Sequence, residues 1–259
     1  MTDRRVDPDP TVARSETPGQ VIVAHVDLCA SPKGARDRQL LLGEAVTVLG
    51  KSRQHSYVRA EKDGYIGYVS SSSIGAPVVH THLVTAAATH AYTGPSIKSA
   101  DLANLSFGAK IRAIGATRDF VETNLGHIPK QALTELPAPP LNPIETARLF
   151  FGTPYLWGGN TRAGIDCSGL VQAALLAAGV PCPGDSDQQE MQLGHPVSDN
   201  SYRPGDVIFW KGHEALVTSA THMIHANAYH MCVVEEPILA AINRISETGG
   251  GPVTAHKRL

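Results

Sequence analysis

The sequence predicts two small all-β domains followed by an α+β domain, and three observations support this prediction. Short β-rich segments alternate with glycine turns over residues 20–76, as in LLLGEAVTVLG (40–50) and YIGYVS (65–70). A second segment of the same kind follows over residues 77–136. A proline-rich stretch at 134–145 then predicts a stiff linker. The region after it contains one helical pattern and several consecutive strand-like runs.

The second β-rich segment repeats the motif order of the first. FGAKIRAIG (107–115) aligns with LGEAVTVLG (42–50) at an offset of 65 residues, and GHIPKQAL (126–133) aligns with GYVSSSSI (67–74) at an offset of 59. The smaller second offset indicates shorter turns in the second copy. Because a repeated unit of about 60 residues indicates an internal duplication, we expect two tandem small β-barrels after a polar tail at 1–19.

The composition excludes several classes of protein. Of the 259 residues, 42% are hydrophobic and 18% are charged, which is typical of a globular chain rather than a disordered one. Lys and Arg total 22 against 24 Asp and Glu, so there is no electrostatic footprint for nucleic acid or an anionic membrane. No run approaches the roughly 18 apolar residues of a membrane span. No signal peptide follows Arg4 and Arg5, so we expect a cytoplasmic protein.

The cysteines and histidines leave two kinds of reactive site to consider. The cysteines are Cys29, Cys167, Cys182 and Cys232. They are too few for a disulfide scaffold, and none forms a CxxC pair. A metal site would have to use His213, His222, His225 and His230. These histidines lack the HExxH spacing, so we expect no metal and no cofactor, and instead a single catalytic thiol.

Cys167 begins a predicted helix, CSGLVQAALLAAG (167–179), for which Gly179 is the expected C-cap and Asp166 the expected N-cap. The dipole and the free N–H groups at a helix N-terminus favour a thiolate, lower its pKa and can stabilise an oxyanion. Glycines in the preceding GTPYLWGGNTRAGID (152–166) allow the backbone to approach a substrate closely. Cys167 is therefore a candidate nucleophile rather than a small buried hydrophobic residue.

A thiol nucleophile needs a base, and two histidines on neighbouring predicted strands could supply it. His213 lies just before ALVTS (215–219), and His225 lies twelve residues later within MIHA (223–226). Two antiparallel strands can bring these imidazoles together. The expected relay runs from Cys167 to His213, with His225 orienting His213 through its other ring nitrogen.

These motifs identify the C-terminal region as similar to the NlpC family of cell-wall cysteine peptidases. The resemblance rests on YLWGGNTRAGIDCSGLV, RPGDVIFW, GHEALV and MIHA, and spans about residues 145–237. It implies a papain-like α+β fold over residues 137–259, linker included. It also implies that Cys167 is the nucleophile, His213 the base and His225 the orienting third member.

The resemblance further implies which residues line the substrate cleft. These are Tyr155, Asp166 and Ser168, and Tyr155 would help to hold the substrate or the oxyanion. The Pro-Arg-Asp-Ser element of the family appears as PGDS (183–186), where Asp185 and Ser186 match but Gly184 replaces the arginine. Any salt bridge of that arginine is therefore in doubt. A helix N-cap is the alternative role for Asp185 and Ser186, and both roles can hold together.

The N-terminal segments resemble bacterial SH3-like domains, which often precede such catalytic domains. Two of them without a signal peptide resemble the subfamily that trims free murein peptides during cell-wall recycling. Its members cut the bond from γ-D-Glu to a diamino acid (meso-diaminopimelate or Lys) and require a free N-terminal L-Ala. The first SH3-like domain supplies groups to the ammonium of the substrate, and Glu44 and Tyr65 are our candidates for that role. The alternatives are a solvated turn for Glu44 and barrel packing for Tyr65.

Two functions of other classes remain open beside hydrolysis of a murein peptide. The same thiol could serve an acyl- or amidotransferase, because an amine can resolve a thioester as well as water can. A non-catalytic peptidoglycan-binding protein could use the SH3-like pair alone. That alternative predicts a degraded triad, whereas Cys167, His213 and His225 are all present.

Overall fold

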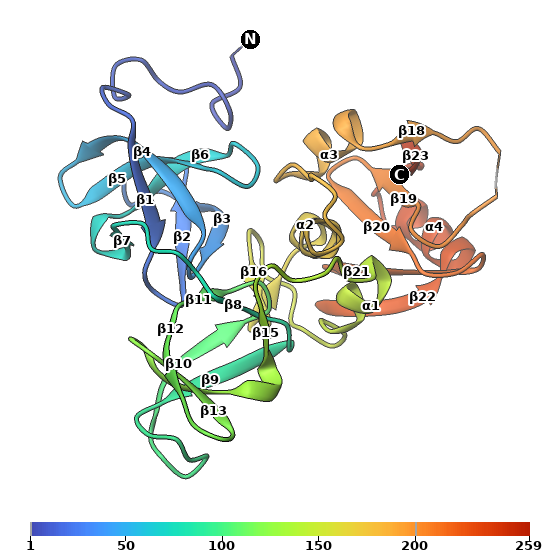
Figure 1. The fold of residues 1–259 in the computed structure, drawn as a ribbon. Coiled ribbons are helices and arrows are strands. Elements are labelled where there is room, and N and C mark those ends of the chain that lie inside the picture. The colour runs from blue at the N-terminus through green and yellow to red at the C-terminus, as the bar shows by residue number, and fades with distance from the viewer. Residues whose placement is uncertain (1, 200) are drawn as a thin grey trace. The chain divides into compact units, whose positions relative to one another are not determined.

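The computed structural model describes residues 2–199 and 201–259, which form two compact units (Figure 1). The first unit ends at Pro139, and the second begins at Pro140. The division therefore falls inside the proline-rich stretch at 134–145. As described, the first unit consists of strands and two 3₁₀ turns, and the second combines four α-helices with a six-stranded sheet.

A seven-stranded antiparallel sheet comes first along the chain. Its strands are β1 (Thr17–Val21), β2 (His25–Cys29), β3 (Arg36–Leu41), β4 (Ala45–Ser52), β5 (His55–Ala60), β6 (Ile66–Ser70) and β7 (Ile74–Gly75). They are hydrogen-bonded in the order β3-β2-β6-β5-β4-β1-β7. The alternation along β4 turns Val46 and Val48 into a core that also contains Leu28, Val58 and Val69. The apolar alternation in the sequence therefore marks the buried face of this sheet.

Residues before β1, expected as part of a polar tail, lie against the same sheet. The Arg4 guanidinium pairs with Asp37 at 2.7 Å. The backbone amide of Ile66 donates to the carbonyl of Arg5 at 2.7 Å, and the amide of Asp9 donates to the Tyr57 hydroxyl at 3.0 Å. These partners are distant in sequence, so the composition of the segment did not indicate them.

The remainder of the first unit forms two smaller sheets. Their strands are β8 (His82–Val84), β9 (Ala88–Tyr92), β10 (Asp101–Ser106), β11 (Lys110–Ile111), β12 (Ala113–Ala116), β13 (Phe120–Thr123), β14 (Gly126–Pro129) and β15 (Leu133–Glu135). Five of them pair in the order β10-β9-β14-β13-β12, and three in the order β11-β8-β15. Val84, Leu105, Ile111 and Ile128 form the core between them, joined by Leu42 from the first segment. The two β-rich segments thus share part of their hydrophobic core.

The two segments repeat one local structure at the spacing that the sequence predicts. β6 is followed by a 3₁₀ turn, η1 (Ser71–Ser73), and then by β7. β14 is followed by a 3₁₀ turn, η2 (Lys130–Ala132), and then by β15. The two turns begin 59 residues apart, which is the offset between GYVSSSSI and GHIPKQAL. The aligned motifs therefore adopt the same strand–turn–strand order.

The second unit is built on a six-stranded antiparallel sheet. Its elements are α1 (Pro143–Arg148), β16 (Asn160–Thr161), β17 (Gly164–Ile165), α2 (Cys167–Ala177), α3 (Ser186–Gln192), β18 (His195–Pro196), β19 (Val207–Trp210), β20 (His213–Val217), β21 (His222–Asn227), β22 (Cys232–Pro237), α4 (Ile238–Glu247) and β23 (Ala255–Arg258). The sheet order is β18-β23-β19-β20-β21-β22. Helix α2 packs against β20 and β21, so the start of the helix is brought to the strands that carry the histidines. This is the predicted α+β arrangement.

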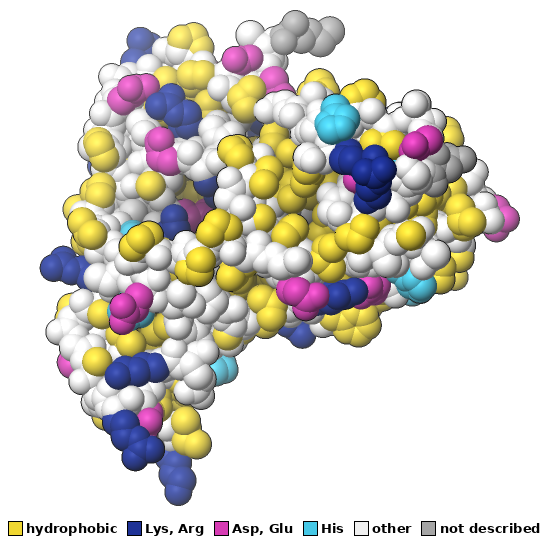
Figure 2. Space-filling model, turned by 45° about the vertical axis from the view of Figure 1, so that its right-hand side comes forward, with side chains coloured by type: hydrophobic (Ala, Val, Ile, Leu, Met, Phe, Trp, Pro, Cys, Tyr) yellow, Lys and Arg dark blue, Asp and Glu magenta, His cyan; other side chains and the backbone are white. Residues whose placement is uncertain are grey.

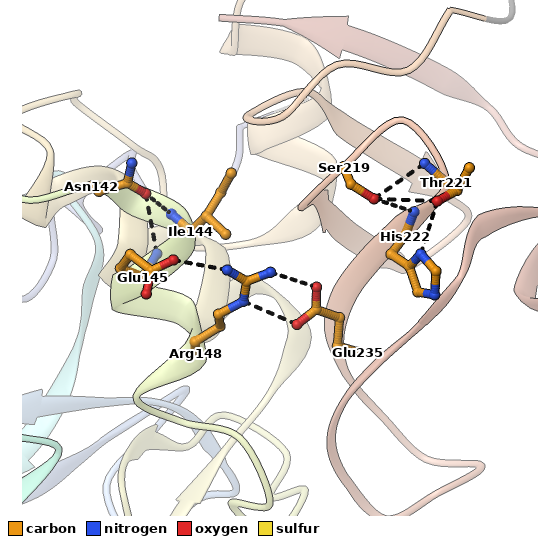
Figure 3. A network of polar contacts seen from close by, with 8 residues as sticks. All are labelled: Asn142, Ile144, Glu145, Arg148, Ser219, Thr221, His222 and Glu235. Atoms are coloured by element: carbon orange, nitrogen blue, oxygen red, sulfur yellow. Dashed lines mark hydrogen bonds and ion pairs between the residues drawn. The ribbon is translucent and has the colours of Figure 1, made fainter.

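Helix α1 is fixed to the sheet by a polar network (Figure 3). Asn142 caps the helix by accepting from the backbone amides of Ile144 and Glu145. Arg148 then bridges Glu145, on its own helix, and Glu235, on β22, at 2.8 Å in each case. The chain therefore docks onto the sheet edge as soon as it enters the second unit.

The surface carries charges of both signs. On the face drawn in Figure 2, Lys and Arg side chains are interspersed with Asp and Glu, in keeping with the net charge of -2. None of the helices described is long and apolar enough to cross a membrane.

Candidate functional site

Cys167 is placed by the cap at the start of α2. The Asp166 side chain accepts from the backbone amide of Gly169 at 2.7 Å and from that of Gly158 at 2.8 Å. The Ser168 hydroxyl donates to the same carboxylate at 3.3 Å. One side chain thus ties the glycine loop to the helix, which confirms the predicted capping role of Asp166 and fixes where Cys167 leaves the loop.

Close packing around Gly169 explains why a glycine follows the Cys-Ser pair. A Cβ atom at this position would lie 2.5 Å from Asn160 Oδ1 and 2.6 Å from the carbonyl oxygen of Gly159. Neither distance is tolerable for a carbon atom. The helix can therefore begin this close to the loop only when residue 169 has no side chain.

The thiol of Cys167 is buried, with 7% of the residue exposed. Burial is the main cause that raises its pKa well above the ordinary value, and the carboxylates of Asp166 and Glu214 raise it further. Hydrogen bonds with the backbone of Glu214 and Ser168 favour the thiolate but do not outweigh burial. The expectation of a lowered pKa at the helix N-terminus is therefore wrong for this structure, and Cys167 rests as a thiol.

The two predicted histidines meet across neighbouring strands. His213 is the first residue of β20, and His225 lies in the middle of β21, which pairs with β20 in antiparallel fashion. His213 Nε2 lies 2.8 Å from His225 Nδ1. The Cys167 thiol hydrogen-bonds with the backbone of Glu214, the residue that follows His213. The structure thus brings His213 and His225 into contact and holds the Cys167 thiol at the backbone of the residue next to His213.

Both imidazoles are neutral at neutral pH. Burial, with smaller contributions from His225 and Arg244, lowers the pKa of His213 to about 3. Burial also lowers the pKa of His225, although the hydrogen bond to Glu236 opposes this. A neutral imidazole is able to take the proton of a neutral thiol as the sulfur attacks a substrate.

Two further residues of this site were not found from the sequence. Glu236, on β22, accepts from His225 Nε2 at 2.7 Å, and Arg244, on α4, donates to Glu236 with both terminal nitrogens. Strand alternation alone does not distinguish Glu236 from Glu235, and it is the pairing of β21 with β22 that does so. Val234 is the cross-strand partner of His225, so Glu236 lies two residues further along on the same face.

Tyr155 lies at the rim of the same site. Its backbone amide donates to the carbonyl of Met231 at 2.9 Å, which anchors the loop before Cys167 next to β22. Burial raises the pKa of the Tyr155 phenol, and Cys167 and Asp166 add to this effect. The phenol is therefore retained as an O–H donor close to the thiol, which suits its expected role toward an oxyanion.

Asp185 and Ser186 lie at the beginning of α3. Asp185 is in the N-cap position, although its side chain makes no capping hydrogen bond, and the helix begins at Ser186. The fully buried Gln189 donates from Nε2 to the backbone carbonyls of Ser168 and Pro183 at 3.1 Å. It also reaches the carbonyl of Gly184, the residue in the place of the arginine of the family, at 3.4 Å. Sequence reasoning missed Gln189, which joins this turn to the residue after Cys167.

The two candidates in the first unit have other contacts there. Glu44 forms an ion pair with Lys62 at 2.6 Å. Tyr65 is 2% exposed and packs in the core with Val46 and Val58. Tyr65 therefore has the packing role that was its alternative, in the core of the seven-stranded sheet rather than in a closed barrel, whereas Glu44 is a paired carboxylate rather than a solvated one.

The remaining two histidines of the metal alternative are not arranged around a common centre. His222 is exposed, and its Nδ1 lies 3.0 Å from the Thr221 hydroxyl (Figure 3). His230 Nε2 lies 3.7 Å from Glu236. Among the described residues, no group of three or more His, Cys, Asp or Glu side chains could hold a metal ion.

Two family models match this chain. Residues 152–242 match the NlpC/P60 family, and residues 28–74 match the bacterial dipeptidyl-peptidase Sh3 domain. The first match contains Cys167, His213, His225 and Glu236. The second contains Glu44 and Tyr65.

Curated relatives match stretches of this chain that differ in length. Dipeptidyl-peptidase 6 of Lysinibacillus sphaericus is 38% identical over 89 residues, which are 33% of this chain and 32% of that protein. Gamma-D-glutamyl-L-lysine dipeptidyl-peptidase of Bacillus cereus is 25% identical over 228 residues, which are 73% of this chain and 67% of that protein. The chain thus spans about a third of the length of some curated relatives and two thirds of another.

The fold is shared with a solved structure. The crystal structure of an NlpC/P60 family protein from Bacillus cereus superposes with a TM-score of 0.75, over 93% of this chain and 99% of the other. The two sequences are 21% identical, so this likeness concerns the fold alone.

Proposed function

We propose that this chain, which contains an NlpC/P60 cysteine peptidase domain and a bacterial SH3 domain, hydrolyses the bond between γ-D-Glu and a diamino acid in free murein peptides. The observation that carries the proposal is the His213–His225 hydrogen bond of 2.8 Å, beside a thiol held at a capped helix N-terminus. This pair of imidazoles and the thiol supply the residue types that thiol catalysis uses, which supports the proposal.

The reaction follows from the protonation states of these groups. His213 accepts the Cys167 proton as the sulfur attacks the carbonyl carbon of the γ-amide. The resulting oxyanion accepts hydrogen bonds from the Tyr155 phenol and the N–H groups of the first turn of α2. The C–N bond then breaks, and the proton on His213 passes to the leaving amine. Water attacks the thioester next, which releases the γ-D-Glu product and restores the Cys167 thiol.

The substrate class is supported by the names of relatives. Two proteins that match this chain, from Bacillus subtilis and Bacillus cereus, are named gamma-D-glutamyl-L-lysine dipeptidyl-peptidase. A γ-D-glutamyl acyl group is therefore part of the proposal, and the diamino acid is meso-diaminopimelate or Lys. Asp166 and Ser168, with Asp185 and Ser186, are included as residues that line the substrate cleft.

The proposal also covers the first unit. The strand–turn–strand order shared by residues 67–74 and 126–133 supports two tandem SH3-like domains, the second over 77–136. Within the first of them, Glu44 and Tyr65 are proposed to recognise the ammonium group of an unblocked N-terminal L-Ala. Because Glu44 is already paired with Lys62 at 2.6 Å, the ammonium would have to share that carboxylate or replace Lys62.

A defined tripeptide tests the reaction. We expect purified protein to convert L-Ala-γ-D-Glu-meso-diaminopimelate, or its Lys counterpart, into L-Ala-D-Glu and the free diamino acid, as measured by mass spectrometry. Cys167→Ala should form no product, whereas Cys232→Ala, at a half-buried thiol in the same unit, should keep activity within about twofold. Full hydrolysis by Cys167→Ala would reject the assignment.

The same assay separates the alternatives. Accumulation of an amide adduct when an amine is added would indicate a transferase. Binding to intact sacculi without any cleavage would indicate a binding protein. Equal cleavage of free and N-acetylated tripeptides would remove the requirement for a free amino terminus, and an unchanged KM in Glu44→Gln would remove Glu44 from substrate recognition.

A further inference from the structure

A chain of short polar contacts continues behind His225, away from the thiol. His225 Nε2 lies 2.7 Å from Glu236 Oε1, and the Arg244 Nη2 group donates to the same oxygen at 2.7 Å. Arg244 Nη1 donates to the second oxygen of Glu236. The Arg244 guanidinium in turn lies over the ring of Tyr229, 4.6 Å from its centroid. Strand β22 and helix α4 therefore hold one carboxylate against the orienting histidine.

The protons along this chain can be placed from the chemistry of its members. Although burial opposes ionisation, hydrogen bonds from His225 and Arg244 lower the pKa of Glu236 to about 2. An ionised carboxylate only accepts, so His225 Nε2 carries a hydrogen. Because His225 is neutral, its Nδ1 is then an acceptor, and the hydrogen between the two imidazoles belongs to His213 Nε2. The lone pair of neutral His213 is left on Nδ1.

We propose that Glu236, held by Arg244, is a positioning residue that fixes the tautomers of His225 and His213 and thereby makes His213 Nδ1 the base for Cys167. This rests on the proposed thiol chemistry. When the Cys167 proton moves to His213 Nδ1, the S–H bond breaks, an N–H bond forms and His213 becomes an imidazolium. Its positive charge is then stabilised through His225 by the Glu236 carboxylate, which stays ionised throughout.

A purely stabilising role for Glu236 would not explain why its carboxylate is placed against His225. A buried or half-buried ion pair is weak support for stability, because desolvation offsets much of the attraction. The neighbouring Glu235 pairs with Arg148 at 2.8 Å (Figure 3), and the alternation along β22 places it on the opposite face from Glu236. The charged and titratable groups around His225 are His213 on β20, Glu236 on β22, Arg244 on α4 and His230 in the turn between β21 and β22. Glu236 is the carboxylate among them.

Alkylation of Cys167 tests this role without any peptide substrate. The rate of reaction with iodoacetamide should be followed at Cys167 by peptide mass spectrometry, from pH 5 to pH 9, in the wild type, Glu236→Gln and the control Glu235→Gln. Gln keeps the size and an acceptor oxygen but removes the charge. Without the charge of Glu236, the pKa of the His213 imidazolium should fall, and each unit of that fall lowers the population of the thiolate–imidazolium pair tenfold. Because the thiolate is the form that reacts, we expect at least about tenfold slower alkylation at neutral pH in Glu236→Gln. Glu235→Gln should stay within about twofold.

A second measurement determines the tautomers in the wild type, so its result does not depend on how Glu236→Gln folds. Nitrogen-15 NMR of labelled imidazoles, assigned by the signals lost in His213→Asn and His225→Asn, should show the Nε2–H tautomer for both residues. An Nδ1–H tautomer for His225, or an unchanged alkylation profile in folded Glu236→Gln, would overturn the proposal. In the peptide assay the variant should lower kcat and leave KM unchanged. Altered alkylation without any peptide hydrolysis would instead reject the proposed substrate and keep the positioning role.

Discussion

The second unit contains two clusters of the same composition: an imidazole, a carboxylate and a guanidinium. In one, His225 and Arg244 hydrogen-bond to Glu236, with 2.7 Å from the imidazole to the carboxylate. In the other, His256 and Arg258 hydrogen-bond to Asp206, also at 2.7 Å. Each cluster includes residues on strands of the same six-stranded sheet, so the two clusters differ in their surroundings and not in the kinds of side chain that they contain.

The difference lies in the contact made by the rest of each imidazole. His225 Nδ1 lies 2.8 Å from His213 Nε2. The next residue after His213 is Glu214, and its backbone hydrogen-bonds with the buried thiol of Cys167. The ring of His256 instead packs against the ring of Tyr202 at a tilt of 38°, with centroids 5.0 Å apart. The second cluster therefore attaches the last strand, β23, to the sheet. Of the two clusters, the first continues through His213 toward a thiol, and this continuation is the basis for the catalytic role that we propose for it.

The largest expected difference between the clusters is in activity. His213→Ala removes the base that the first cluster orients, and we expect kcat for the tripeptide to fall by at least about 10³-fold. His256→Ala should keep kcat within about threefold, because the second cluster touches no reacting group. Steady-state kinetics on the two purified variants measure this contrast. Activity of His213→Ala above a tenth of wild type would contradict it.

The second cluster should contribute to stability without contributing to catalysis. Asp206 is 2% exposed and accepts from His256, from Arg258 and from the backbone amide of Arg203. Asp206→Asn leaves the Arg258 guanidinium without its counter-charge, so we expect a loss of about 2–3 kcal/mol in the free energy of unfolding. Urea unfolding followed by tryptophan fluorescence reports this unit selectively, because both tryptophans, Trp157 and Trp210, lie in it. Folded Asp206→Asn with kcat lowered as far as in Glu236→Gln would break the comparison.

Acid should weaken the second unit through both carboxylates. The pKa of Glu236 is lowered from 4.5 to about 2, and that of Asp206 is lowered as well. Each unfolded carboxyl therefore binds its proton at higher pH than the folded one, so stability is present above pH 4.5 and is lost as the pH falls toward 2. Glu236 accounts for up to about 3 kcal/mol of this loss. Glu236→Gln should flatten the fall in unfolding free energy between these pH values, and an unchanged slope would show that the carboxylate is not held as described.

The sequence was sufficient for the residues whose role is local. Cys167, its cap Asp166 and the strands of His213 and His225 all follow from short motifs and from period-2 alternation. Glu236 and its partner Arg244 could not be identified in this way. The sequence alone does not distinguish Glu236 from the adjacent Glu235, and only the pairing of β22 with β21 shows which of them faces His225. Strand β23 and helix α4 were missed as well. The pairing of β23 with β19 joins segments about 50 residues apart and depends on Asp206 rather than on apolar pattern.

The direction of the Cys167 pKa was also beyond motif reasoning. A helix N-terminus lowers the pKa of a thiol only where solvent or a counter-charge supports the thiolate. Here burial and two carboxylates, Asp166 and Glu214, act in the opposite direction. Their combined effect depends on how deeply the packed loop covers the sulfur, which is a property of the folded unit.

The smallest effect is expected at Arg148, whose ion pairs lie at the surface. The Arg148 side chain is 41% exposed, and it bridges Glu145 and Glu235 at 2.8 Å (Figure 3). Exposed pairs contribute little because water screens the charges and long side chains lose freedom, so Arg148→Ala should cost less than about 1 kcal/mol. Salt at 0.5 M should reduce even this difference between wild type and variant, because the Debye length becomes about 4 Å. Urea unfolding at low and high salt measures both values. A loss of unfolding free energy as large as that in Asp206→Asn would contradict this prediction. It would show that the exposed ion pairs of Arg148 stabilise the unit as much as the pair of the buried Asp206 with Arg258 does.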